Sequence, residues 1–201
     1  MIKKLKDKLL KYRIVENYFR FQRGWPIRSN GPKGDRTIIL NPYWDDMILS
    51  AWGTISECVG KDISYWIYND KNPSFKYPFA RCSDSNLSQY DTVFLPVPWD
   101  EHPEHIAVSK TVLPDKIEAW GYQVYGTIAT TTIVDISDYT SKFIMLKKAQ
   151  AYLHDRDWIH YAMCKDGLAS RHLHNGMGRG YAELFCVMRG REWNELVDKI
   201  L

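Results

Sequence analysis

The chain has 201 residues and a formal net charge of +3, because 27 Lys and Arg stand against 24 Asp and Glu. At this length we expect one domain that buries roughly 70% of the surface of its unfolded chain without a disulfide or metal. Apolar residues make up 45% of the chain and charged residues 25%, which excludes an intrinsically disordered protein.

A basic amphipathic helix is predicted over residues 2–22. Apolar residues recur there at three- and four-residue spacing, and lysines dominate the other faces. Residues 28–36 are rich in Gly and Pro and show no apolar period, which is typical of a linker. We therefore divide the chain into a basic helical arm with its linker, residues 1–36, and a globular domain, residues 37–201.

The first half of the domain is expected to alternate between strand and helix. A strand is predicted at residues 37–40, and a helix follows that Asn41 caps and Gly60 ends. Asp45 and Asp46 would lie near the positive end of its dipole. Residues 63–68 alternate in polarity, which predicts a strand. Residues 92–97 form another strand, whose proline assigns it to an edge of the sheet because proline cannot donate to the ladder.

The second half is expected to contain a polar loop, two strands and then helices. Residues 98–104 are predicted to form the loop, with strands at residues 106–112 and 122–136. Helical segments are predicted at residues 137–153, 155–163 and 181–200, with a break at Gly167 between the last two.

Helices at both ends of the chain with strands between them favour an α+β fold over a strictly alternating α/β fold. We predict a single domain with a central, mainly antiparallel sheet that is flanked by helices. The basic amphipathic N-terminal helix would precede this domain.

The cysteines and the lengths of the apolar runs indicate in which cellular compartment the protein is found. The four cysteines form no CxxC pair, which favours reduced thiols in a cytoplasm, or in the host-cell cytoplasm if the protein is viral. No apolar run is long enough for a transmembrane span, and the first residues lack the apolar core of a signal peptide. We therefore predict an intracellular protein without a transmembrane segment.

The stretch from Arg171 to Gly180 is the strongest candidate for a ligand site. Its alternating glycines would bring backbone N–H groups close to a ligand, and a helix beginning at residue 181 would favour an anion. Two arginines could clamp a phosphate or carboxylate. The predicted ligand-binding residues are Arg171, His172, His174, Asn175, Gly176, Gly178, Arg179 and Gly180. His172 and His174 are also the candidate acid/base residues.

The alternative for this stretch is an exposed connection with solvated side chains, because it matches neither the P-loop nor the dinucleotide-binding motif. Two further groups of polar residues have spacings that could carry chemistry. His102 and His105 have a spacing that can bind a metal, but we interpret residues 99–105 as a solvated loop. Residues 154–157 with His160 are interpreted as ion pairs on a helix surface. We assign no metal ligand and no cofactor.

The basic arm is the candidate surface for nucleic acid or for a protein partner. Its clustered charges could contact a phosphate backbone or an acidic partner, and a solubilising face on a docked helix is the alternative. The residues concerned are Lys3, Lys4, Lys8, Lys11 and Arg13.

These features together predict a binding protein for nucleic acid or for a phosphate-bearing ligand. One alternative is a structural or interaction subunit of a larger assembly, viral or otherwise, or a homo-oligomer, in which the plentiful Trp and Tyr contact a neighbour. The other is a phosphoester-processing enzyme that uses the loop histidines. No complete catalytic motif is present, so the sequence leaves open whether the protein is an enzyme.

Overall fold

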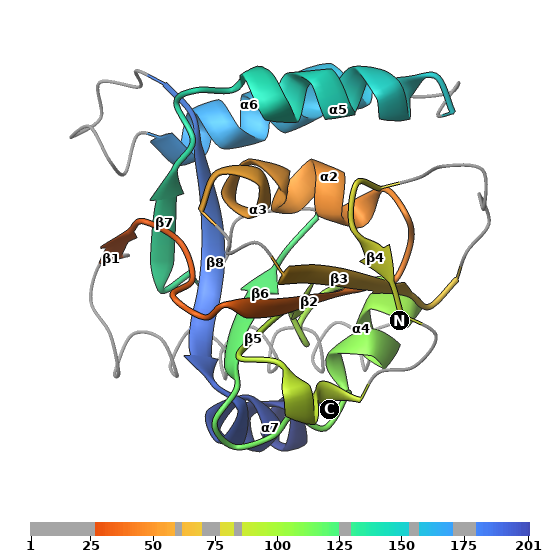
Figure 1. The fold of residues 1–201 in the computed structure, drawn as a ribbon, viewed down its shortest axis with the longest axis vertical. Helices are drawn as coiled ribbons and strands as arrows, with labels where there is room; N and C mark the ends of the chain where they lie inside the picture. The colour runs from red at the N-terminus through yellow and green to blue at the C-terminus, as the bar shows by residue number, and fades with distance from the viewer. Residues whose placement is uncertain are drawn as a thin grey trace, which may run out of the picture.

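The strands form one eight-stranded mixed sheet with helices on both faces (Figure 1). The computed structural model describes residues 27–58, 62–69, 77–82, 86–124, 130–152, 157–170 and 180–201. The prediction of a single α+β domain with a central sheet between helices is confirmed. The predicted N-terminal helix lies outside the described residues, and no helix within them is long and apolar enough to cross a membrane.

The sheet has the strand order β1-β7-β8-β6-β5-β2-β3-β4. Its strands are β1 (Ile27–Ser29), β2 (Arg36–Asn41), β3 (Asp62–Ile67), β4 (Ala80–Arg81), β5 (Thr92–Pro96), β6 (Glu118–Tyr122), β7 (Thr132–Asp135) and β8 (Ala182–Arg189). The helices are α2 (Asp46–Ser50), α3 (Trp52–Cys58), the 3₁₀ helix η1 (Leu87–Gln89), α4 (Pro103–Ser109), α5 (Thr140–Gln150), α6 (Trp158–Ala169) and α7 (Gly190–Ile200).

The prediction of a mainly antiparallel sheet was wrong. Among the described strands, every pairing is parallel except the two that β8 makes with β6 and β7. Parallel neighbours need a crossover, and α2 with α3 supplies it between β2 and β3. Helix α4 supplies it between β5 and β6, in the place where the sequence predicted a strand at residues 106–112.

Helix α4 begins as helices commonly do. Pro103 occupies its first turn, and the His102 side chain accepts a hydrogen bond from the Glu104 backbone N–H. Glu104 also favours the positive end of the helix dipole. These three residues explain why the chain turns helical where the apolar spacing of residues 106–112 alone indicated a strand.

The last predicted helix, residues 181–200, is in fact strand β8 followed by helix α7. The tertiary pairing of β8 between β6 and β7 overrides its helix-like spacing of apolar residues. Strand β5 also differs from expectation, because it lies in the interior between β2 and β6. Pro96 is its last residue, so the missing donor falls at the end of the ladder.

Smaller corrections concern the other predicted boundaries. Asn41 is the last residue of β2 and not a helix cap, and the helix after it breaks at Ala51 into α2 and α3. Gly167 lies inside α6 and does not end it. Residues 28 and 29, assigned to a linker, belong to β1. The predicted strands at residues 37–40 and 63–68 and the helix at 137–153 are confirmed as β2, β3 and α5.

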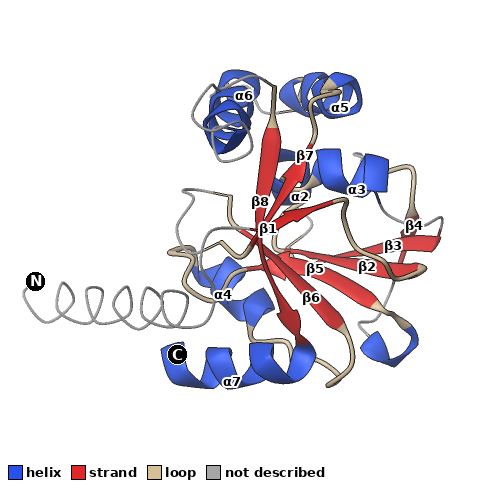
Figure 2. Cartoon of the chain, turned by 90° about the vertical axis from the view of Figure 1, so that its left-hand side faces the viewer, coloured by secondary structure: helices blue, strands red, loops and turns tan. Residues whose placement is uncertain are grey.

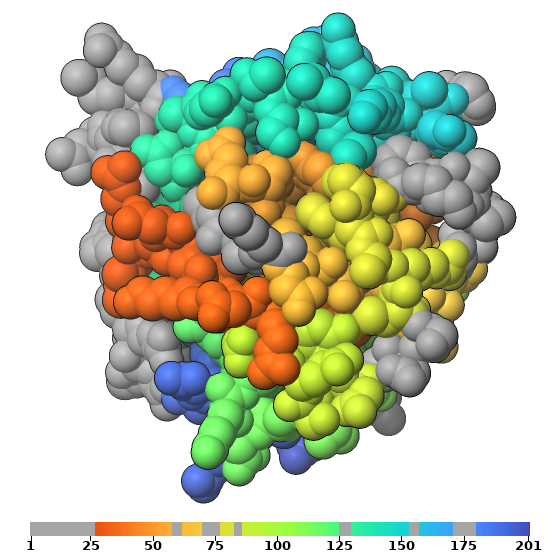
Figure 3. Space-filling view, viewed as in Figure 1, coloured from red at the N-terminus to blue at the C-terminus, as the bar shows by residue number. Residues whose placement is uncertain are grey.

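Two apolar cores lie on the two faces of the sheet. One packs α2, α3, α5 and α6 against one face, and the other packs α4 and α7 against the opposite face (Figure 2). In the space-filling view, teal α5 forms the top of the visible surface above the orange residues of α2 and α3 (Figure 3). The first face therefore carries two layers of helix.

Helix α7 approaches the sheet closely at Gly121 in β6. A methyl group on Gly121 would lie 2.7 Å from the Trp193 ring and 3.0 Å from Val97. Gly121→Ala is therefore expected to lower the free energy of unfolding by about 1–3 kcal/mol, because a fully buried ring would have to move. Urea denaturation measures this change.

Gly167→Ala is the matched control for that substitution. Its added methyl group would meet nothing closer than Tyr181, 3.9 Å away, and the residue lies inside a helix. We expect it to raise stability by up to about 1 kcal/mol. Equal effects of the two alanines would contradict the packing described for Gly121.

Candidate functional site

The chain changes direction in the sheet between β2 and β5. From β2 it crosses to β3 on one side, and from β5 it crosses to β6 on the other, so the two crossovers diverge. In open parallel sheets, ligands bind outside the carboxyl ends of strands at such a switch point. The residues that follow β2 and β5 therefore define the candidate site.

A buried histidine joins the two loops at this point. His105 Nε2 lies 3.3 Å from Asp46 Oδ2, and its Nδ1 lies 3.0 Å from Asp100 Oδ2. All three side chains are almost completely buried. Asp46 begins α2, which follows β2, whereas Asp100 and His105 lie in the loop and in helix α4 that follow β5, so this cluster closes the switch point from both sides.

A second layer of polar side chains surrounds this cluster. Tyr43 Oη lies 3.5 Å from His102 Nε2, and the rings of His102 and His105 have centroids 4.9 Å apart. His102 Nδ1 accepts from a backbone N–H, which leaves the proton of the neutral ring on Nε2, facing Tyr43. The backbone N–H of Tyr43 donates to Asp46 Oδ2. The site thus presents a phenol beside two imidazoles.

Among the shifted pKa values at the site, those of Asp45 and His105 decide which groups are charged near neutral pH. Burial and the neighbouring Asp46 charge raise the pKa of Asp45 to about 7. Burial disfavours the charged form of His105, but Asp100 and Asp46 outweigh it and raise the pKa of His105 to about 10. Near neutral pH the site therefore contains a carboxyl that readily exchanges its proton and a positively charged imidazole.

The Asp46–His105 pair has the spacing of two metal ligands. Two atoms that each lie about 2.0–2.2 Å from a tetrahedral zinc ion are separated by roughly 3.3–3.5 Å. Asp100, on the far nitrogen of His105, is placed as carboxylates commonly are behind a metal-bound histidine. Among the described residues, however, no three His, Cys, Asp or Glu side chains are placed to hold one metal ion together, so the protein offers a cation two such ligands there.

Solved structures share this fold. The N,N'-diacetylchitobiose deacetylase from Pyrococcus horikoshii, solved with its inhibitor MPG, superposes with a TM-score of 0.55 at 15% identity, over 90% of this chain and 92% of that chain. The conserved protein TT1542 from Thermus thermophilus superposes with a TM-score of 0.52 at 17% identity, over 77% of this chain and 94% of that one. No protein-family model and no curated protein matches the sequence.

The interpretation of residues 99–105 as a solvated loop was wrong. Asp100 and His105 are buried, and His102 caps α4 and contacts Tyr43. For Asp45 and Asp46, the sequence pattern predicts only a place at the start of a helix. The missed signal is that each group directly follows a predicted strand.

The other predicted site residues have different outcomes. His160 and Asp157 form an exposed ion pair on α6, as predicted. Gly180 has a φ of +89° and precedes strand β8, so the argument from a helix N-terminus fails there. Several candidates lie outside the described residues and stay predictions: Lys3, Lys4, Lys8, Lys11, Arg13, Arg171, His172, His174, Asn175, Gly176, Gly178 and Arg179.

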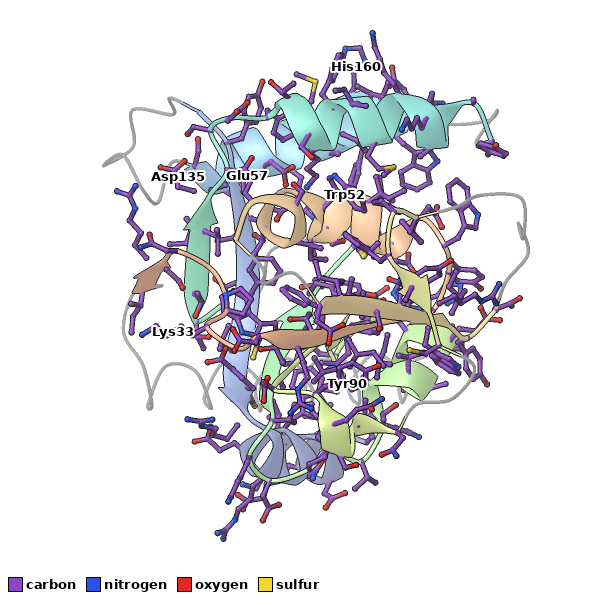
Figure 4. All side chains as sticks on the ribbon, in the orientation of Figure 1. Lys33, Trp52, Glu57, Tyr90, Asp135 and His160 are labelled. Atoms are coloured by element: carbon purple, nitrogen blue, oxygen red, sulfur yellow. The ribbon has the colours of Figure 1, made fainter. Side chains whose placement is uncertain are left out.

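A surface cavity of about 760 Å³ lies at the opposite edge of the sheet, at the amino ends of β2, β5 and β6. Lys33 and Tyr90 line it, and Figure 4 places both in the lower half of the view, away from Asp135 and His160. Its basic and acidic residues are equal in number: Lys33, Arg36, Lys116 and Arg189 against Asp35, Asp91, Asp115 and Glu118. This balance favours neither an anion nor a cation.

Proposed function

We propose that the protein is a hydrolase that removes an acyl group from an N-acylated small molecule. The observation that carries this proposal is the buried Asp46–His105–Asp100 cluster beside Asp45, at the switch point of the sheet. The fold shared with a deacetylase supports the choice of reaction.

The site has the groups that amide hydrolysis needs. Asp45, with a pKa of about 7, can take a proton from water and return it to the leaving amine near neutral pH. Without a bound cation, the charged His105, with a pKa of about 10, is the group that can stabilise the negative oxygen that develops on the acyl carbon. Two neighbouring groups with pKa values far apart are the pattern that separates a base from a charge-stabilising group.

A divalent cation fits this site at two coordination positions. Asp46 and His105 would hold it, and it would polarise the acyl carbonyl and lower the pKa of a bound water. The cation would take the position that the proton on His105 Nε2 occupies in its absence, so its binding releases a proton. The sequence analysis assigned no metal ligand, and that prediction stays untested.

The proposal is tested by acetate release. The protein is incubated with N,N'-diacetylchitobiose, N-acetylglucosamine and N-acetylglycine, with EDTA or with added zinc, and acetate is measured. His105→Gln is expected to lower the rate at least about 100-fold. His160→Gln removes an exposed histidine that is also paired with an aspartate, and it should leave the rate unchanged. No acetate from any substrate, or an active His105→Gln, contradicts the proposal.

Binding of nucleic acid or of a phosphate-bearing ligand by the arm and the Arg171–Gly180 stretch stays a prediction. So do the alternatives of an assembly subunit and of a phosphoester-processing enzyme, because their residues lie almost entirely outside the described part of the chain.

A further inference from the structure

A lysine from α6 reaches the same edge of the sheet as the candidate site. Lys165 Nζ lies 2.9 Å from the carbonyl oxygen of Gln123, just beyond the carboxyl end of β6. Its other contacts, with Ser50 Oγ and the Val124 carbonyl, are both 3.5 Å long. The ammonium thus donates one hydrogen bond of ordinary length, and its two other acceptors lie at the longest distance that still counts as a hydrogen bond.

Helix α2 connects this lysine to the buried cluster. Asp46 and Ser50 are four residues apart in α2, so they lie on one face with their Cβ atoms about 6 Å apart. Asp46 contacts His105, and Ser50 contacts Lys165. The charge of Asp100 also acts on Lys165, although less strongly than the charges of Asp166 and Glu183. The ammonium therefore lies about one helical turn from the proposed reaction centre.

In the described part of the chain, the carboxylates that act on Lys165 do so at longer range and without direct contact. Within the described ranges no carboxylate lies at ion-pairing distance from its Nζ, whereas the neighbouring Lys142 contacts two. Burial lowers the pKa of Lys165 to about 8. An ammonium in these surroundings gains from an anion that supplies charge and oxygen acceptors together.

We propose that Lys165 is a specificity-determining residue that binds an anionic oxygen group of the substrate, either a carboxylate or a phosphate. The inference rests on the proposed deacylase function and narrows its substrate class to N-acylated compounds that carry a negative charge. Ser50 Oγ and the Gln123 and Val124 carbonyls hold the ammonium in place.

The experiment compares sugars that share one N-acetylated ring. Binding of N-acetylglucosamine, its 6-phosphate and N-acetylmuramic acid to the whole protein is measured by calorimetry, and acetate release is followed in parallel. Lys165→Gln removes the ammonium, and Lys148→Gln removes an exposed lysine of α5 as the matched control. The 6-phosphate and N-acetylmuramic acid, which carries a carboxylate, show which of the two kinds of anion is bound.

Wild type and Lys148→Gln are expected to bind at least one anionic sugar about tenfold or more tightly than the neutral sugar, because a charged hydrogen bond discriminates by that much. Lys165→Gln should lose this preference while its affinity for the neutral sugar stays the same. No preference in wild type, or an equal loss for all three sugars in Lys165→Gln, overturns the inference. If the wild type prefers an anionic sugar but releases no acetate, the role of Lys165 stands and the deacylase function is refuted. If it releases acetate equally from all three sugars, the deacylase function stands and the role of Lys165 is refuted.

Discussion

Lys142→Met is expected to lower the free energy of unfolding by about 3–5 kcal/mol, because it leaves two buried carboxylates without their cation. Lys142 Nζ lies 2.7 Å from Asp166 and also contacts Glu183, and all three side chains are fully buried. Burial disfavours the ammonium, but the two carboxylates outweigh this effect and raise the pKa of Lys142. Urea denaturation followed by tryptophan fluorescence measures the loss.

The size of this effect follows from how many elements the cluster joins. Lys142 belongs to α5, Asp166 to α6 and Glu183 to β8. Glu183 also accepts from the backbone N–H groups of Gly53 and Thr54 in α3, at 3.1 and 2.7 Å. One ammonium therefore holds together the two layers of helix and the strand beneath them.

Two further variants make this prediction specific. Lys148→Met removes an exposed lysine from the same helix and should change stability by less than about 0.5 kcal/mol. Adding Asp166→Asn and Glu183→Gln to Lys142→Met removes the uncompensated charges and should recover part of the loss. A loss below about 1 kcal/mol in Lys142→Met would show that the cluster is not buried as described.

Asp45→Asn is expected to abolish most of the acetate release, with a rate loss of about 10²–10⁴-fold, because an amide cannot accept the proton. The same substitution should make the protein more stable at pH 8 and change it little at pH 4. Activity and stability would then move in opposite directions at one residue, as is common at catalytic sites.

The sign of the stability change follows from the raised pKa of Asp45. The folded pKa is about 7 and the unfolded value 3.8, so above pH 3.8 the unfolded chain loses this proton first. Asp45 therefore destabilises the fold increasingly from about pH 4 to pH 7 and by a constant amount above that. Asparagine does not ionise and avoids this cost.

Urea denaturation at pH 4 and pH 8 measures this difference. Asp115→Asn, at an exposed position on the opposite edge of the sheet, is the control and should show no such dependence on pH. Full activity in Asp45→Asn would remove Asp45 from the proposed mechanism. A stability change that is the same at both pH values would contradict its raised pKa.

The layered α+β character of the fold could be predicted from the sequence, but the direction of its strands could not. Strands β2 and β3 and helix α5 have clear local patterns. The position of β8 depends on its partners β6 and β7, and its spacing of apolar residues also fits a helix. Pairing with strands that are distant in the sequence makes this segment a strand, and no local sequence pattern indicates that pairing.

Because the sheet was predicted to be mainly antiparallel, the candidate site was not predicted either. The sequence places Asp45 and Asp46 after one predicted strand and Asp100 to His105 after another. In an antiparallel sheet the carboxyl ends of neighbouring strands lie at opposite edges, so the segments that follow them are not expected to come together. In a parallel sheet they meet at one edge, and the two groups become one site.

The buried Lys142 cluster could not have been anticipated in the same way. Lys142, Asp166 and Glu183 are far apart in the sequence, and each looks like an ordinary charged residue of a helix surface. Only the packing of α5 and α6 over the end of β8 removes them from water.

The position of β8 has a consequence for how the chain folds during synthesis. Among the strands that the structure describes, residues 182–189 form the one that connects β1 and β7 to the other five strands of the sheet. The earlier strands can pair among themselves as they leave the ribosome, but the two groups cannot join until Arg189 has been made. A nascent chain stalled before this point would expose strand edges on both groups, and such edges promote aggregation.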